Sequence, residues 1–287
     1  MNMTKKFWKR LAVIVAIAMI IGLVGFANAF MGNPVSKMLA QNTAEEILKT
    51  KYKNKDYQIN DVVYSFKDGY YHARISSPSS IDSKFNLSIN MFGKLEYDNY
   101  ASITDGYNTA DRLNNEYRKL TDPILEKIML KYKGDIYYGA LEIRTKNSID
   151  YESEDDDIPE YAMVQESLEV DKLYDIRKLG RSVGHIIIYV ETDDISPKNA
   201  ANILKYVREE FDEAGAPFRA IDLTLRHSKT ETGSVPKGEL NIINFNYDDI
   251  YKDDLVEKVK KADKEAKEYY AKLDKEKLEQ EKEVDEK

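Results

Sequence analysis

A short apolar run, Gly184-His185-Ile186-Ile187-Ile188-Tyr189-Val190, carries the clearest structural signal in the chain. It is rich in β-branched residues and too short for a helix, so it predicts a buried central strand. A helix is expected next, because Ser196 can cap it, Pro197 suits its first position and Gly215 can end it. The buried stripe of this helix would be formed by Ala200, Ile203, Leu204, Val207, Phe211 and Ala214.

More elements are expected on both sides of this strand and helix. Four segments predict strands or extended chain from their residue patterns: 136–145, 161–175, 218–227 and 238–247. An amphipathic helix is predicted from Tyr107, with Pro123 marking a kink or break, and a loop is predicted at 230–238. The expected result is a domain over residues 105–251, with helices on one side of an antiparallel or mixed sheet.

The preceding part of the chain predicts a smaller α+β domain over residues 33–104. Apolar residues at spacings of three and four from Leu39 to Tyr52 predict a helix. Gly69 in a turn signal predicts a hairpin, and a bulge is expected near Asp61. The predicted strands are 57–66, 71–75, 85–91 and 95–100. We therefore expect one helix lying across one face of an antiparallel sheet.

The N-terminus predicts a membrane anchor over residues 1–32. An uncharged, almost wholly apolar run extends from Leu11 to Met31, and a helix of this length is about 31 Å long, enough to span the hydrocarbon of a bilayer. Cations on its N-terminal side predict a cytoplasmic N-terminus and a chain otherwise outside the cell. The flanking residues, with Trp8 at the level of the lipid headgroups, are Lys5, Lys6, Trp8, Lys9 and Arg10. The alternative is a signal peptide cleaved after Ala29, since Ala27-Asn28-Ala29 has the small-x-small form.

Composition excludes several classes of protein and site. The chain has no cysteine, so it has no disulfide and no thiolate metal site. Its formal net charge is −8, and four of its cations precede the apolar run, so nucleic acid is not an expected partner. The frequent Lys, Tyr and Ile residues suit a low-GC Gram-positive bacterium.

The last segment, residues 252–287, predicts a charged helix that frays after Leu273. Its apolar residues repeat at four and three and form a narrow seam over 255–273. This seam could pack on the second domain or pair with another copy of the chain. The seam residues are Leu255, Val259, Ala262, Ala266, Tyr269 and Leu273.

Several short motifs resemble the YfjL-like family of membrane-anchored Firmicutes proteins. They are Gly32-Asn33-Pro34-Val35-Ser36-Lys37, Lys51-Tyr52, Val63-Tyr64-Ser65-Phe66-Lys67-Asp68-Gly69-Tyr70-Tyr71 and Ser77-Pro78-Ser79-Ser80. The resemblance covers about residues 30 to 100 most closely. It implies an N-terminal domain similar to cystatin or PepSY folds, and it transfers no catalytic motif.

No catalytic, cofactor or metal motif is recognisable. There is no Gly-x-Ser-x-Gly sequence and no phosphate-binding glycine loop. The three histidines, His72, His185 and His227, fall in different predicted strands without a second ligand at local spacing, and only His185 stands out. The acidic residues at 152–157 lack the spacing of a calcium loop and predict a solvated segment. We therefore expect no catalytic residue, no cofactor and no metal.

The leading hypothesis is a membrane-anchored extracytoplasmic binding or regulatory module, whose partner would be another envelope protein. Its candidate interaction surface is a tyrosine-rich sheet face, formed by Tyr64, Tyr70, Tyr71, Tyr97 and Tyr100. One rival is a cell-envelope hydrolase with a dispersed site, built from carboxylates and His185 or His227. Another is a structural protein that self-associates through 255–273. A pocket that joins a histidine to two carboxylates would favour the hydrolase, and an exposed tyrosine face would favour binding.

Overall fold

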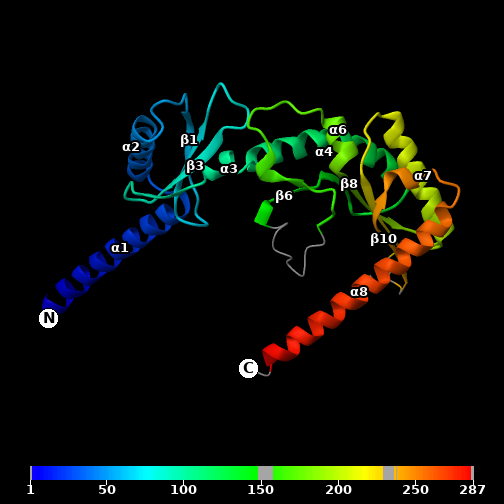
Figure 1. Cartoon of the computed structure of the whole chain (residues 1–287). Helices are drawn as coiled ribbons and strands as arrows, with labels where there is room; N and C mark the ends of the chain where they lie inside the picture. Colours follow the sequence, from blue (N-terminus) through cyan, green and yellow to red (C-terminus); the bar gives the residue numbers. More distant parts are fainter. Residues whose placement is uncertain (1, 148–157, 229–235, 237, 286–287) are drawn as a thin grey trace. The chain divides into compact units, whose positions relative to one another are not determined.

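The computed structural model describes residues 2–147, 158–228, 236 and 238–285 (Figure 1). It divides into two compact units, Met1–Thr109 with Glu169–Asp171, and Ala110–Leu168 with Lys172–Lys287. The predicted acidic segment 152–157 and most of the predicted loop 230–238 lie outside the described residues. Both units combine helices with a sheet, so the α+β part of the predicted fold class is shown.

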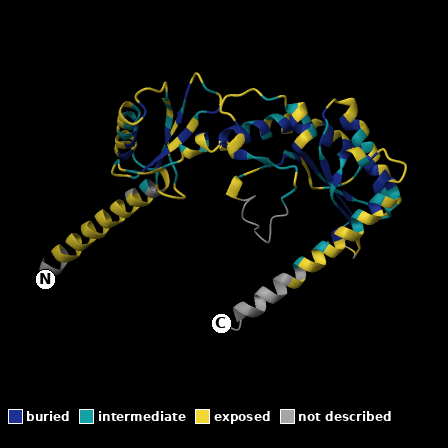
Figure 2. Cartoon of the chain, in the orientation of Figure 1, coloured by how far each residue is buried: buried dark blue, intermediate teal, exposed yellow. Residues whose placement is uncertain are grey.

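The first unit begins with helix α1 (Asn2–Met31), whose described large apolar side chains from Leu11 to Phe30 are exposed (Figure 2). None of the helices, over the residues that the structure describes, has both the length and the apolar composition needed to cross a membrane.

A tight joint separates α1 from α2 (Pro34–Thr50). Gly32 has a φ of +67°, and a Cβ atom there would lie 2.7 Å from the Tyr71 hydroxyl, so a side chain does not fit. Asn33 caps α2, because its side chain accepts a hydrogen bond from the Ser36 N–H at 2.7 Å. The Tyr71 hydroxyl accepts the Asn33 N–H at 2.7 Å, which ties the joint to the sheet.

Helix α2 contacts a four-stranded antiparallel sheet of order β1-β2-β3-β4. Its strands are β1 (Gln58–Tyr64), β2 (Tyr71–Ser76), β3 (Lys84–Ile89) and β4 (Leu95–Asp98), and a short helix α3 (Ala101–Thr104) follows. The register shifts between Ile59 and Asp61, where a bulge was predicted. Alternate strand residues join Ala40 and Ala44 of α2 in one core, so the predicted helix on an antiparallel sheet is confirmed.

The second unit has a four-stranded sheet of order β10-β9-β8-β5. These strands are β5 (Tyr137–Leu141), β8 (Gly184–Glu191), β9 (Ala220–Arg226) and β10 (Glu239–Asn246). Its helices are α4 (Tyr107–Lys131, which starts in the first unit), α6 (Ile176–Val183), α7 (Pro197–Glu213) and α8 (Leu255–Asp285). Shorter elements are β6 (Ile143–Arg144), β7 (Met163–Val164), η1 (Gln165–Ser167) and η2 (Tyr247–Asp249).

Of the two sheet types predicted for the second domain, antiparallel or mixed, the structure has the mixed one, so the antiparallel alternative is wrong. Strands β8 and β9 pair in parallel, because α7 connects them as a crossover, whereas β5–β8 and β9–β10 are antiparallel. The predicted cap of α7 is confirmed, since the Ser196 hydroxyl accepts the Asn199 N–H at 3.2 Å. Helix α4 continues through Pro123, and α6 was not predicted.

Helix α8 packs on β10 and α7. Leu255, Val259 and Ala266 of the predicted seam are buried, and the first two belong to the core of the second unit. This corresponds to the alternative in which the seam packs on its own domain. The helix continues to Asp285, beyond the point where fraying was predicted, and its Lys, Glu and Gln residues have high helix propensity.

The two faces of the second sheet differ in chemistry. Apolar residues of α4 and α7 form one core with Ile186, Ile188 and Leu223, which point to the same face of the sheet. The residues between them, including His185 and Asp222, point to the opposite face. One side of this sheet is therefore an apolar core, and the other carries polar side chains.

Candidate functional site

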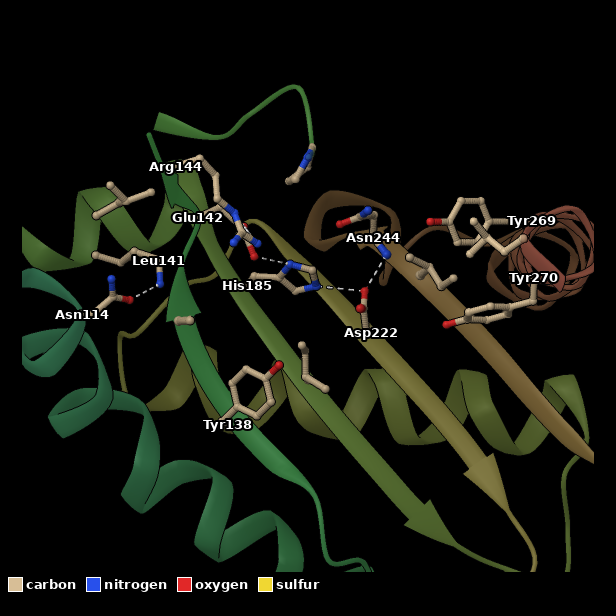
Figure 3. A pocket seen from close by; sticks show the side chains of 16 residues that line it. Asn114, Tyr138, Leu141, Glu142, Arg144, His185, Asp222, Asn244, Tyr269 and Tyr270 are labelled. Atoms are coloured by element: carbon tan, nitrogen blue, oxygen red, sulfur yellow. Dashed lines mark hydrogen bonds and ion pairs between the residues drawn. The ribbon is translucent and has the colours of Figure 1, made fainter. Parts of the chain in front are cut away.

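His185 lies on the polar face, near the start of β8, with a carboxylate on each side (Figure 3). Its Nδ1 is 3.0 Å from Oε1 of Glu142, and its Nε2 is 2.9 Å from Oδ1 of Asp222. The register explains the arrangement, because Asp222 on β9 is paired with Ile187 and so points to the same face as His185. The three residues come from three separate segments of the chain.

Asp222 is held by an irregularity in β10. The register shifts between Ile242 and Phe245, so two residues, Ile243 and Asn244, lie opposite Asp222. Asn244 has a φ of +52°, a left-handed conformation that asparagine tolerates better than most residues. Its N–H donates to Asp222 Oδ1 at 2.7 Å. The bulge therefore brings both the N–H and the side chain of Asn244 to the site.

Glu142 lies where the chain leaves β5 and enters β6. Its N–H donates to the Val183 carbonyl, and its own carbonyl accepts the Met163 N–H, each at 2.8 Å. Its Oε2 accepts hydrogen bonds from Arg144 Nε at 3.1 Å and Nη2 at 3.0 Å. Burial opposes ionisation, but the hydrogen bond from His185 and the charge of Arg144 lower the pKa of Glu142 overall.

The two carboxylates keep the His185 ring charged. Burial by itself lowers the pKa of the imidazole, but the hydrogen bonds to Asp222 and Glu142 outweigh this effect and raise its pKa to about 9. Both ring nitrogens therefore donate, and neither is left to accept a proton from a substrate. The Tyr161 hydroxyl, 3.4 Å from Nδ1, donates instead to Asn244 Oδ1 at 3.0 Å.

A cavity of about 580 Å³ opens over this cluster. Ala140 and Ile187 are among the residues of its sheet floor, and Tyr138 on β5 and Tyr270 on α8 lie on opposite sides of Asp222, with their hydroxyls directed inward (Figure 3). Partial burial and the charge of Asp222 both raise the pKa of the Tyr138 hydroxyl. The pKa of the Tyr270 hydroxyl is also raised, first by burial and in part by Asp222. The cavity therefore combines aromatic walls with a charged, hydrogen-bonded centre.

Several polar atoms in the cavity remain without a hydrogen-bond partner among the described residues. Asp222 uses only Oδ1 in its contacts with His185 and Asn244, which leaves Oδ2 as an acceptor. Asn244 uses its backbone N–H and Oδ1, which leaves Nδ2 as a donor. Ligand sites characteristically present a few such groups in a largely apolar hollow. The described side chains include no group of His, Asp and Glu that could hold a metal ion.

The five tyrosines of the candidate interaction surface lie in different environments in the first unit. Tyr71 is buried, and its hydroxyl accepts a hydrogen bond from the Asn33 N–H. Because of this burial, Tyr71 cannot contribute to an exposed face. Tyr64 and Tyr100 are half-buried and pack against the core. Tyr97 is exposed and contacts Tyr70 edge to face, with ring centroids 5.8 Å apart.

The sequence singled out His185 but did not identify its partners. His72 bonds to Asp68 and Ser88 in the first unit, and His227 lies beyond the end of β9. Glu142, Asp222, Asn244 and Tyr161 were missed. The available signal was Asp222-x-Thr224-x-Arg226, a polar alternation on β9 that indicates a second, uncovered sheet face.

Two family descriptions match the chain. The description "YfjL-like, N-terminal domain" matches residues 6–99, and "YfjL-like C-terminal domain" matches residues 116–260. Comparisons with curated proteins and with solved structures gave no match.

Proposed function

The chain belongs to the YfjL-like family, and we propose that it is a membrane-anchored binding protein whose second unit takes up a small polar ligand outside the cytoplasm. The observation that carries this proposal is the cavity over His185, which is lined by Asp222 and Asn244, each with a polar side-chain atom that has no hydrogen-bond partner among the described residues. A volume of about 580 Å³ lies within the usual range for small-molecule sites. The tyrosine surface of the first unit supports binding less well, since Tyr71 is buried.

The anchor is proposed from the sequence of α1. Residues Leu11–Met31 carry no charge, and the described large apolar side chains among them are exposed. Residues 6–23 contain three cations, Lys6, Lys9 and Arg10. The proposed membrane-crossing segment starts at Leu11, after the last of these cations. With Lys5, Lys6, Lys9 and Arg10 on the cytoplasmic side, both units would lie outside the cell membrane.

The binding proposal is tested by thermal unfolding of the full chain in nanodiscs, with a panel of small polar molecules. The panel contains neutral sugars, amino acids and dipeptides, polyamines, nucleotides and inorganic phosphate. We expect at least one class to raise the unfolding temperature of the wild type, because a ligand that binds only the folded state stabilises it. Ala140→Phe should abolish this rise, since Ala140 lines the cavity floor, whereas Ala101→Phe on an exposed position should preserve it.

Failure of every class to stabilise the wild type would contradict the proposal, as would equal stabilisation of Ala140→Phe. Asp222→Asn has nearly the same shape as the wild type, and it serves as a second test if Ala140→Phe does not fold. It should weaken binding because it replaces a carboxylate oxygen that accepts hydrogen bonds.

The hydrolase remains a second candidate, because the cavity does join a histidine to two carboxylates. Its difficulty is chemical: a general base needs a free nitrogen, and both nitrogens of His185 already face carboxylates. Incubation of the full chain with peptide, ester and glycan substrates tests it. Hydrolysis by the wild type that is lost in His185→Asn and kept in His72→Asn would establish the hydrolase instead of the binding protein.

A further inference from the structure

We propose that the ligand of the cavity in the second unit is an uncharged sugar, bound by Asp222 and Asn244 between the rings of Tyr138 and Tyr270. This inference rests on the proposed binding function and specifies its ligand class. Three features of the cavity carry it: the balance of its charges, the kind of its unpaired polar atoms and the position of its aromatic rings.

The charges at the cavity centre compensate one another. Glu142 is bonded to both Arg144 and His185, and Asp222 is bonded to His185, so two anions face two cations. A charged ligand would lose its hydration in the cavity. It would find no unpaired opposite charge there, which makes its binding unfavourable. The cluster therefore disfavours phosphates, polyamines and free carboxylates relative to a neutral ligand.

The unpaired atoms match hydroxyl groups. Asp222 offers an acceptor at Oδ2 and Asn244 offers a donor at Nδ2, and both residues are fixed by the hydrogen bond between the Asn244 N–H and Asp222 Oδ1. Each sugar hydroxyl can donate one hydrogen bond and accept others. A molecule with several hydroxyls can thus supply a donor for the carboxylate and an acceptor for the amide. A neutral ligand without a hydrogen-bond donor would leave the carboxylate oxygen unpaired.

The aromatic rings supply the contact that a sugar ring needs. Tyr138 and Tyr270 are 40% and 44% exposed, so the rings are partly open to a ligand, and they lie on opposite sides of Asp222 (Figure 3). The C–H faces of a pyranose are apolar and pack on aromatic side chains, while its hydroxyls point toward polar groups. The volume of about 580 Å³ accommodates a mono- or disaccharide.

Saturation-transfer NMR on the full chain tests the ligand class. The chain is placed in nanodiscs, because the common maltoside and glucoside detergents are themselves sugars and would occupy the site. The probes are glucose, N-acetylglucosamine, galactose, rhamnose and maltose, with alanyl-alanine, spermidine and inorganic phosphate as the charged comparison. We expect saturation transfer to at least one sugar and none to the charged probes.

Variants then locate the binding. Tyr138→Ala and Asp222→Ala should each raise the dissociation constant of that sugar at least tenfold. Tyr137→Ala is the matched control, since Tyr137 is the neighbour of Tyr138 on β5 and points to the other face of the sheet, and it should change the constant less than twofold. Tyr138→Phe keeps the ring and should retain most of the affinity, and Asp222→Ala serves as the test if Tyr138→Ala does not fold.

The possible outcomes separate the two proposals. If a charged probe binds in the cavity and no sugar does, the binding function stands and the sugar assignment is wrong. If a sugar binds with equal affinity to Asp222→Ala and to the wild type, its site lies elsewhere and the inference is overturned. If no probe and no member of the thermal-unfolding panel binds, both proposals fail.

Discussion

At the scale of single residues, the two carboxylates beside His185 determine the charge of its ring, although the ring is buried. Removal from water disfavours a charged imidazole, but two carboxylates at hydrogen-bond distance make the charged form the more stable one. The ring is then a fixed double donor that orients Glu142 and Asp222. Its contribution lies in positioning those oxygens and in balancing their charge.

This balance predicts a pH dependence of stability. The pKa of His185 is raised from 6.5 to about 9, so its contribution to stability is complete below the unfolded value and is lost as pH rises through the folded value. We expect the free energy of unfolding in urea to fall by up to about 3 kcal/mol between about pH 6 and about pH 9.5.

His185→Asn should remove most of this decline, and His72→Asn should retain it. Ring-nitrogen NMR of the three histidines provides an independent measurement, in which His185 stays an imidazolium at neutral pH. A wild-type stability that is constant or rises over this interval would contradict the assignment.

At the scale of elements, helix α7 and the bulge of β10 have different origins. The helix is specified locally: Ser196 caps it, Pro197 starts it and the apolar residues repeat at helical spacing. The bulge has no such local signal, since the residue pattern at 238–247 predicts an ordinary strand. It is defined only by the pairing of β10 with β9, which places Asn244 against Asp222.

The local origin of α7 leads to a prediction about its cap. Ser196→Ala should lower the free energy of unfolding by about 1 kcal/mol, because the Asn199 N–H loses its acceptor. Ser196→Asp should restore most of the loss, since aspartate also caps helices. Lys198→Ala, an exposed change in the same turn, should stay within about 0.5 kcal/mol of the wild type. Equal urea midpoints for Ser196→Ala and the wild type would contradict the role of the cap.

At the scale of the whole molecule, the proposed placement of the chain depends on its N-terminus. The cations before Leu11 and the uncharged residues after it would set the orientation of everything that follows. The ligand site would then face the outside of the cell and would sample molecules of the envelope.

Protease added to intact cells stripped of their wall tests this orientation. We expect digestion of the chain beyond residue 32, while a cytoplasmic marker protein stays intact. Replacing Lys5, Lys6, Lys9 and Arg10 together by Glu should reduce the digested fraction severalfold, because the positive flank that holds the N-terminus inside is lost. A wild-type chain as resistant as the cytoplasmic marker would overturn the proposed orientation.

Much of the first unit could be predicted, because its elements follow one another along the chain. The sheet order β1-β2-β3-β4 needs only hairpins between neighbours, and turns such as the one at Gly69 have recognisable sequences. The environment of Tyr71 could not be predicted. Alternation places it on one face of β2, but only the packed joint at Gly32 and Asn33 shows that this face is closed.

By itself, the sequence determined the local elements and the family of this protein, because periodicity, caps and turn residues act over a few neighbouring positions. Only the tertiary structure decided the parallel pairing of β8 with β9 and the meeting of Glu142, His185, Asp222 and Asn244. Those contacts join strands that are distant in the chain, and strand order depends on how the whole unit buries its apolar residues. The polar alternation on β9 indicates an uncovered sheet face, but no single segment identifies the complete ligand site.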